Sequence, residues 1–126
     1  MQLNLEHPDH EFLLRGADGT VAVVNDRQLT SSFILATDRL IDAWPVSDPH
    51  TLAAGDLVPL LELEPEVILL GTGATQVFPP AAVMAACLSR GIGIEVMSNA
   101  AAARTFNVLA SESRRVVAGF ILHTTP

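Results

Sequence analysis

Apolar and polar positions follow two different periods along this chain. In the second half, Val67–Leu70 is apolar at every position, which is typical of a central strand covered on both faces. Residues 81–90 instead repeat apolar side chains at helical spacing, and Pro80 suits the first turn of such a helix. The whole pattern predicts strands over 67–70, 94–97 and 116–123 and helices over 81–90 and 99–109.

The first third of the chain has the pattern of antiparallel strands. Ala17-Asp18-Gly19 is a hairpin turn signal between two apolar stretches, and residues 25–27 predict a second turn. Pro59 and Pro65 limit any helix in the middle of the chain to short pieces. Four strands are expected before that point, over residues 11–15, 20–24, 32–36 and 40–44.

The strand–helix–strand unit of the second half predicts one crevice. Such units cross over with a right hand, so the strands at 67–70 and 94–97 should run parallel. Their carboxyl ends then meet at one edge of the sheet, which brings Gly71, Thr72 and Gly73 close to Ser98 and Asn99. Ligands of open α/β sheets bind at such places.

Composition limits the class of protein. A chain of 126 residues that is 49% apolar is expected to form a single domain over residues 1–126. No apolar run approaches the ~20 residues that cross a bilayer, and the first residues do not resemble a signal peptide. The lone Cys87 cannot form an internal disulfide. We therefore expect a cytoplasmic protein that is not an integral membrane protein.

Charge is split unevenly between the two halves. Residues 1–66 carry twelve acidic and three basic side chains (−9), whereas residues 67–126 carry two acidic and four basic ones (+2), which together give the net charge of −7. An acidic surface repels phosphate backbones, so no nucleic-acid partner is expected. A local arginine patch in the second half could still hold a small anion or an acidic partner.

The first candidate for chemistry is the glycine loop. Glycines allow a ligand to approach the backbone, and free amides of Gly71, Thr72 and Gly73 could form an anion nest. Gln76, however, stands where a dinucleotide fingerprint has glycine or alanine, and no Walker-type lysine follows. A tight turn after the strand explains these glycines slightly better than a binding loop does.

The second candidate is the start of the following helix. Ser98 and Asn99 could direct helix amides into the crevice, with Arg104 one and a half turns further on beside its mouth. Helix capping alone explains Ser98 and Asn99 well. An anion site therefore requires that the glycine loop really lies alongside.

Three further features favour structural interpretations. Glu95 lies among apolar neighbours and needs a partner, so we expect a structural ion pair with Arg114 or Arg115, or with Arg104. Cys87 lies on the apolar stripe of its helix and is expected to be a buried, inert thiol. The histidine pair at positions 7 and 10 is too weak a signal for a metal site, and no cofactor is predicted.

Several motifs of this chain occur together in one small family. They are Val67 through Gly71-Thr72-Gly73, Pro79-Pro80, Gly91 through Met97, Arg104 through Leu109, Glu112 and Arg114-Arg115. With these motifs the chain resembles the single-domain family shared by mitochondrial complex I assembly factor three and the adipogenesis-associated protein, which is widespread in bacteria and archaea as an uncharacterised domain. The resemblance spans roughly Phe33 to the carboxyl end.

The resemblance implies a fold class but no chemistry. The fold would be α/β and three-layered, with a mixed central sheet flanked by helices and an additional antiparallel β-layer from the N-terminal strands. The family supplies no established catalytic residues that could be transferred to this chain. Members often have aspartate and threonine after the Glu-Val-Met run, where this chain has Ser98 and Asn99, so a mechanism that needs a carboxylate at this turn does not transfer.

Two hypotheses about function follow. The first is a non-enzymatic protein-binding module, similar to an assembly factor, which is favoured because no convincing nucleophile, metal set or acid–base pair is present. The second is a protein that binds a small anion, or an unrecognised enzyme, which would use the crevice of Gly71–Gly73, Ser98, Asn99 and Arg104. The sequence does not determine the oligomeric state.

Overall fold

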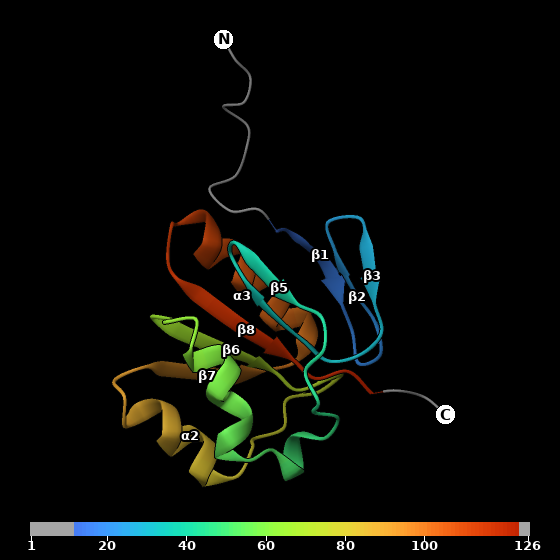
Figure 1. Cartoon of the computed structure of the whole chain (residues 1–126). Helices are drawn as coiled ribbons and strands as arrows, with labels where there is room; N and C mark the ends of the chain where they lie inside the picture. Colours follow the sequence, from blue (N-terminus) through green and yellow to red (C-terminus); the bar gives the residue numbers. More distant parts are fainter. Residues whose placement is uncertain (1–11, 124–126) are drawn as a thin grey trace.

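The computed structural model describes residues 12–123, which form two β-sheets and three α-helices (Figure 1). The predicted histidine pair at positions 7 and 10 lies outside this part of the chain. The strands are β1 Leu14–Ala17, β2 Ala22–Val24, β3 Arg27–Leu29, β4 Phe33–Ala36, β5 Arg39–Ile41, β6 Val67–Gly71, β7 Gly93–Met97 and β8 Val116–Phe120. The helices are α1 Val58–Leu61, α2 Ala81–Leu88 and α3 Asn99–Ser111, and two short 3-10 turns cover Pro49–Thr51 and Ala54–Leu57.

The central sheet has five strands in the order β5-β4-β8-β6-β7. Strand β6 runs parallel to both β7 and β8, whereas β4 runs antiparallel to β8 and β5. All five residues of β6 are buried, as expected for a strand between two neighbours with both faces covered. The sheet is therefore mixed, and the parallel pairing predicted from the crossover is confirmed.

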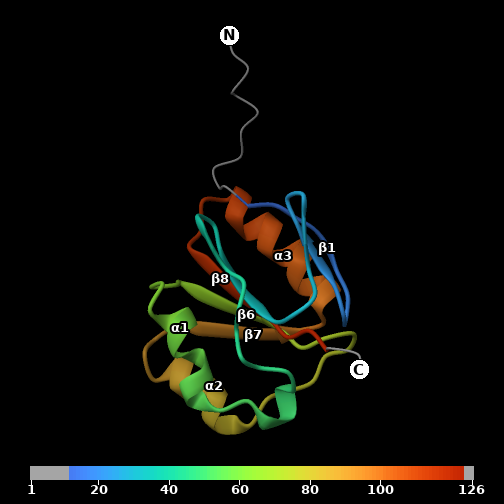
Figure 2. The same cartoon turned by 45° about the vertical axis from the view of Figure 1, so that its right-hand side comes forward.

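Helix α3 covers one face of this sheet and separates it from the small sheet β1-β2-β3. Figure 2 shows α3 lying between β8 and β1. Phe106 of α3 is fully buried, and Phe33 and Phe120 of the central sheet stack below it in the same core with their ring centroids 4.9 Å apart. Asn107 fastens β1 to the helix, because its side chain accepts from Leu14 N at 3.1 Å and donates to Leu14 O at 2.7 Å.

The opposite face of the central sheet is covered by α1, α2 and the segment that precedes them. Trp44, Leu57 and Leu60 pack into a second apolar cluster against this face, together with Val83 and Cys87 of α2. The indole N–H of Trp44 donates to Asp56 O at 3.0 Å. The predicted fold class is confirmed: an α/β architecture with helices on both faces of a mixed sheet and an additional antiparallel layer.

Local boundaries differ from the sequence expectations in the first third. Residues 27–29, part of which was expected as a turn, form the third strand of the small sheet, because Gln28 and Arg27 pair with Val23 and Val24. The strand expected over 40–44 is shorter and ends at Ile41. None of the helices between residues 12 and 123 has the length and apolarity needed to cross a membrane.

Candidate functional site

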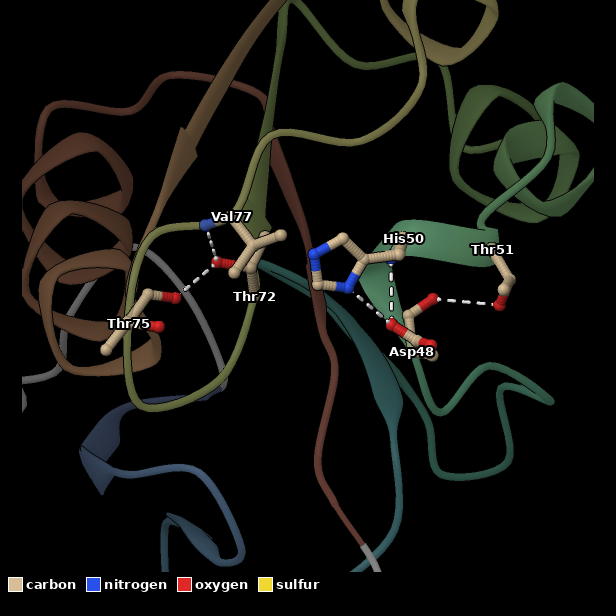
Figure 3. Close-up of polar contacts among 6 residues, drawn as sticks. All are labelled: Asp48, His50, Thr51, Thr72, Thr75 and Val77. Atoms are coloured by element: carbon tan, nitrogen blue, oxygen red, sulfur yellow. Dashed lines mark hydrogen bonds and ion pairs between the residues drawn. The ribbon is translucent and has the colours of Figure 1, made fainter.

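The loop that follows β6, residues 72–80, is organised by one buried threonine. The hydroxyl of Thr72 accepts a hydrogen bond from Val77 N at 2.9 Å and donates to Thr75 O at 2.7 Å (Figure 3). It also lies 3.3 Å from Met97 O at the end of β7. Thr72 therefore fixes the loop on itself and on the neighbouring strand, and its proton is already donated within the protein.

The glycine loop lies beside the start of α3, as the crossover predicts. The backbone N–H of Asn99 donates to Gly73 O at 2.8 Å, and Thr72 N donates to Met97 O at 3.0 Å. Ser98 is the N-cap of α3 and accepts from Ala101 N at 3.3 Å. The structure therefore brings Gly71, Thr72 and Gly73 together with Ser98 and Asn99.

The remaining member of the predicted crevice stands apart from this cluster. Arg104 lies further along α3 with an exposed side chain, and its guanidinium has no hydrogen-bond or ion-pair partner among residues 12–123. It is therefore not held toward the glycine loop by any contact in the described chain.

A turn of the N-terminal hairpin packs against this edge of the sheet. The side-chain amide of Asn99 donates to Asp18 O at 2.8 Å and to Ile121 O at 3.0 Å. His123 N donates to Gly19 O at 2.8 Å, so the segment that follows β8 also holds the turn. The edge that could have been open to a ligand thus contacts the β1–β2 turn of the same chain.

The turn keeps its shape through the carboxylate of Asp18. Its Oδ1 accepts from Val21 N at 2.9 Å and from Thr20 N at 2.8 Å, and from the Thr20 hydroxyl at 3.2 Å. The hydrogen bonds from the Thr20 and Val21 backbones lower the pKa of Asp18. The carboxylate therefore stays ionised as part of the turn.

A second polar group lies near the same edge. His50 donates its backbone N–H to Asp48 Oδ1 at 2.9 Å, and its Nδ1 lies 3.0 Å from the same oxygen. Figure 3 shows the imidazole between Asp48 and the loop that carries Thr72. The hydrogen bonds from the backbone and the ring of His50 lower the pKa of Asp48. The histidine side chain is 71% exposed, so this pair faces solvent.

The chemistry available at this edge is limited. The Thr72 hydroxyl donates to a carbonyl, so it is not poised as a nucleophile for His50. Within residues 12–123, no group of three or more His, Cys, Asp or Glu side chains is placed to hold a metal ion. The hydrogen bonds of Asn99 and His123 join the N-terminal hairpin to the central sheet. A ligand role for this edge of the sheet stays a prediction.

Within residues 12–123, Glu95 forms no ion pair with Arg104, Arg114 or Arg115, contrary to the sequence expectation. Glu95 is exposed on the edge strand β7, and β6 separates it from β8, which Arg115 precedes. Arg115 instead lies 3.2 Å from Asp38 Oδ1 and donates through Nε and Nη2 to Leu63 O. An edge strand exposes the side chain of Glu95 to water, so the carboxylate needs no buried partner.

Cys87 is buried in the core, and burial raises the pKa of its thiol. Because the thiolate is the reactive form, we expect iodoacetamide to alkylate Cys87 slowly in the folded protein at pH 8 and rapidly in denaturant. Mass spectrometry of timed samples measures the two rates. Native labelling as fast as that of the unfolded chain would contradict the buried placement.

Some residues at these contacts could not be recognised from sequence reasoning. Asn107 belongs to the Arg-Thr-Phe-Asn motif, but its bonds to Leu14 join positions 93 residues apart. Gln76 was considered only as a departure from a dinucleotide fingerprint, whereas its amide donates to Val96 O at 2.8 Å. The only usable signal for Asn107 was its place in a motif that otherwise consists of core and surface positions.

Comparison with known proteins agrees with this architecture. Residues 15–121 match the family model described as a protein of unknown function (DUF498/DUF598). The chain belongs to this family. A solution NMR structure of a Xanthomonas campestris protein is 55% identical, has a TM-score of 0.83, and is matched over 97% of this chain and 92% of that chain.

Two curated relatives carry descriptive names. A Danio rerio protein named NADH dehydrogenase [ubiquinone] 1 alpha subcomplex assembly factor 3 is 44% identical over 80 residues, which is 62% of this chain and 46% of that protein. The chain thus spans about half the length of this relative. A Francisella tularensis protein named 13 kDa major membrane protein is 26% identical over 95 residues, which is 75% of this chain and 77% of that protein.

Proposed function

We propose that this protein is a non-enzymatic, cytoplasmic protein-binding module of the assembly-factor type, which holds its partner on the outer side of α2. The observation that carries the proposal is the exposure of two large apolar side chains at the two ends of α2, Phe78 at 66% just before the helix and Leu88 at 60% as its last residue. We call this surface the α2 face. It consists of Phe78, Ala81, Ala82, Ala85 and Leu88, all exposed.

The α2 face is unusual because the helix has no polar side. Residues 81–88 contain no charged side chain, although Val83 and Cys87 already fill the buried side of the helix. A helix at the surface of a domain normally presents charged or polar residues to water, and one that is apolar all round is normally covered. A partner that covers Phe78 and Leu88 would gain on the order of 2–4 kcal/mol from these two side chains.

The chemistry of the partner follows from the surroundings of this face. A partner needs an apolar centre to cover Phe78 and Leu88, which flank a helix without charged side chains. The Danio rerio relative named as an assembly factor supports a role in holding other proteins. The anion-binding alternative at Gly71–Gly73 and Ser98 is less well supported, because Gly73 O and the Asn99 N–H bond each other.

A second copy of the chain is a poorer partner than a different protein. Strand β7 is the edge of the central sheet beside α2, but it carries the exposed carboxylate of Glu95. The side chain of Gln76 also covers Val96 O of this strand. Charged residues and covered carbonyls on an edge strand oppose pairing between sheets.

The test compares partner capture by three forms of the protein in its native host. The protein, a Phe78→Asp/Leu88→Asp variant and a Val108→Asp variant are tagged, expressed and recovered after mild crosslinking. Val108 is a matched control, since it is apolar and 54% exposed but lies on α3, across the central sheet. We expect one stoichiometric partner to be retained by the protein and by Val108→Asp and to be lost from the double variant.

Reconstitution then separates direct from indirect binding. The captured partner is purified and titrated into each form by calorimetry, where we expect the double variant to bind at least tenfold more weakly. The absence of any stoichiometric partner, or equal binding by the three forms, would argue against the proposal. Light scattering that shows a dimer disrupted only by Phe78→Asp/Leu88→Asp would assign the face to a second copy.

A further inference from the structure

A small hollow lies at the end of the central sheet opposite to the glycine loop. It has a volume of about 180 Å³ and is lined by Thr37, Ala110, Ser113, Arg114 and Arg115. We call it the arginine hollow. It forms where the end of α3 meets the turn between β4 and β5, because Arg115 directly precedes β8 and β8 pairs with β4. Pockets for whole ligands usually start near 300 Å³, so this space suits a single functional group.

Arg115 is held rigidly at the wall of the hollow. Its Nε and Nη2 donate to Leu63 O at 3.1 and 2.9 Å, and its Nη1 donates to Asp38 Oδ1 at 3.2 Å. A guanidinium has five N–H donors, so two of them have no acceptor among the described residues. Because the side chain is already fixed, a ligand that binds these two donors orders little additional structure.

Arg114 and Thr37 add donors without acceptors. Neither the guanidinium of Arg114 nor the Thr37 hydroxyl has a hydrogen-bond or ion-pair partner among residues 12–123. At these two positions the hollow is therefore lined by a cationic donor and a hydroxyl donor whose hydrogen bonds the described chain does not use. Such a set of donors matches an oxyanion, and the planar guanidinium matches a carboxylate or phosphate through two parallel bonds.

Unpaired carbonyls at the carboxyl end of a helix repel an anion. At the carboxyl end of α3 this repulsion is reduced, because hydrogen bonds occupy the last carbonyls. Ser113 N donates to Ala110 O and Arg114 N donates to Leu109 O, with Ser113 in the left-handed region at a φ of 60°. This is a Schellman motif, which occupies the last carbonyls of the helix. The two carboxylates that contact Arg115 are also engaged, since Asp38 pairs with its guanidinium and Glu66 accepts Arg115 N at 2.8 Å.

We propose that the arginine hollow binds one carboxylate or phosphate group, with Arg114 as the principal contact and with Arg115 and Thr37 as supporting donors. This site is independent of the α2 face, which lies on other elements. Because Asp38 and Glu66 reduce the local positive charge, affinity on the order of millimolar is expected, and it should weaken as ionic strength rises.

The test is a titration of the ¹⁵N-labelled protein followed by backbone amide NMR. Inorganic phosphate and acetate are added separately at constant ionic strength, with sodium chloride as the reference. We expect saturable shifts at Thr37, Ser113, Arg114 and Arg115 with at least one of the two anions. Saturation by acetate alone would identify a carboxylate ligand, and saturation by phosphate alone would identify a phosphate ligand.

Matched arginine variants locate the site. Arg114→Ala is expected to weaken binding about tenfold, and Arg104→Ala, which removes another exposed arginine without a partner, should leave it unchanged. Arg114→Lys should bind more weakly than the unaltered protein, because lysine lacks the planar fork. Shifts that do not saturate, that equal those with chloride, or that survive Arg114→Ala would overturn the proposal.

Discussion

Replacing Gly71 with alanine is expected to lower the free energy of unfolding by about 3 kcal/mol, at or above the upper end of the usual cost of overpacking a core. A Cβ at this position would lie 2.3 Å from Asn99 Oδ1 and 3.1 Å from Phe120 Cδ2. Gly71 ends the fully buried strand β6, so neither the backbone nor Phe120 can move away without disturbing the core. Urea unfolding measures the loss, and the melting temperature should fall by roughly 10 °C.

Gly93→Ala is the matched control for this substitution. Gly93 lies on the neighbouring strand β7, and a Cβ there would meet only Val67 Cγ2 at an ordinary contact distance of 3.9 Å. We expect no loss of stability from Gly93→Ala. If the two variants were equally stable, the close approach of Asn99 to Gly71 could not be the reason for the glycine.

A double substitution tests the contact itself. Removing the Asn99 side chain removes the nearest obstacle to a Cβ at Gly71. Gly71→Ala should therefore cost less in an Asn99→Ala background than in the unaltered protein. Costs that simply add would show that Phe120, rather than Asn99, opposes the added Cβ.

The strand and helix pattern of the second half was predictable because each element shows its own period locally. Val67–Leu70 is apolar throughout, and the structure places β6 in the middle of the sheet. The handedness of crossovers then sufficed to predict the parallel pairing with β7 and the closeness of Gly73 to Asn99. Local sequence and a general rule of topology were enough for these features.

Neither the strand order nor the packing of the β1–β2 turn against the candidate ligand edge was predictable from the local sequence pattern. Glu95 was expected to pair with an arginine, yet β7 is an edge strand and Arg115 meets Asp38 across the β4–β8 pairing. The contact between Asn99 and Asp18 O joins residues 81 positions apart. The sequence around Asn99 does not indicate a contact with Asp18, nor the reverse, because the two residues meet only after the hairpin packs against the sheet.

Replacing Asn99 is expected to loosen the N-terminal hairpin. The side chain is fully buried, and its amide donates to Asp18 O and Ile121 O while Oδ1 has no hydrogen-bond partner among residues 12–123. Asn99→Ala leaves two carbonyls without their donor, which should cost about 2–4 kcal/mol. Hydrogen exchange should show the largest loss of protection in β1 and β2, since the Asp18 turn is held there. Ser98→Ala, which removes only the adjacent helix cap, should cost about 1 kcal/mol.

Asn99→Asp should be more harmful than Asn99→Ala at neutral pH, although it keeps the shape of the side chain. The ionised carboxylate would face the carbonyls of Asp18 and Ile121 in place of an N–H donor. Burial and these acceptors raise the pKa of the introduced carboxyl in the folded state above about 3.9, its value in the unfolded chain. The folded state therefore binds the extra proton more tightly, so the variant loses stability as pH rises above that value. Urea unfolding from pH 4 to pH 8 should show the gap to the unaltered protein widening with pH, and a gap that stays constant would mean that the carboxyl group is not buried against these carbonyls.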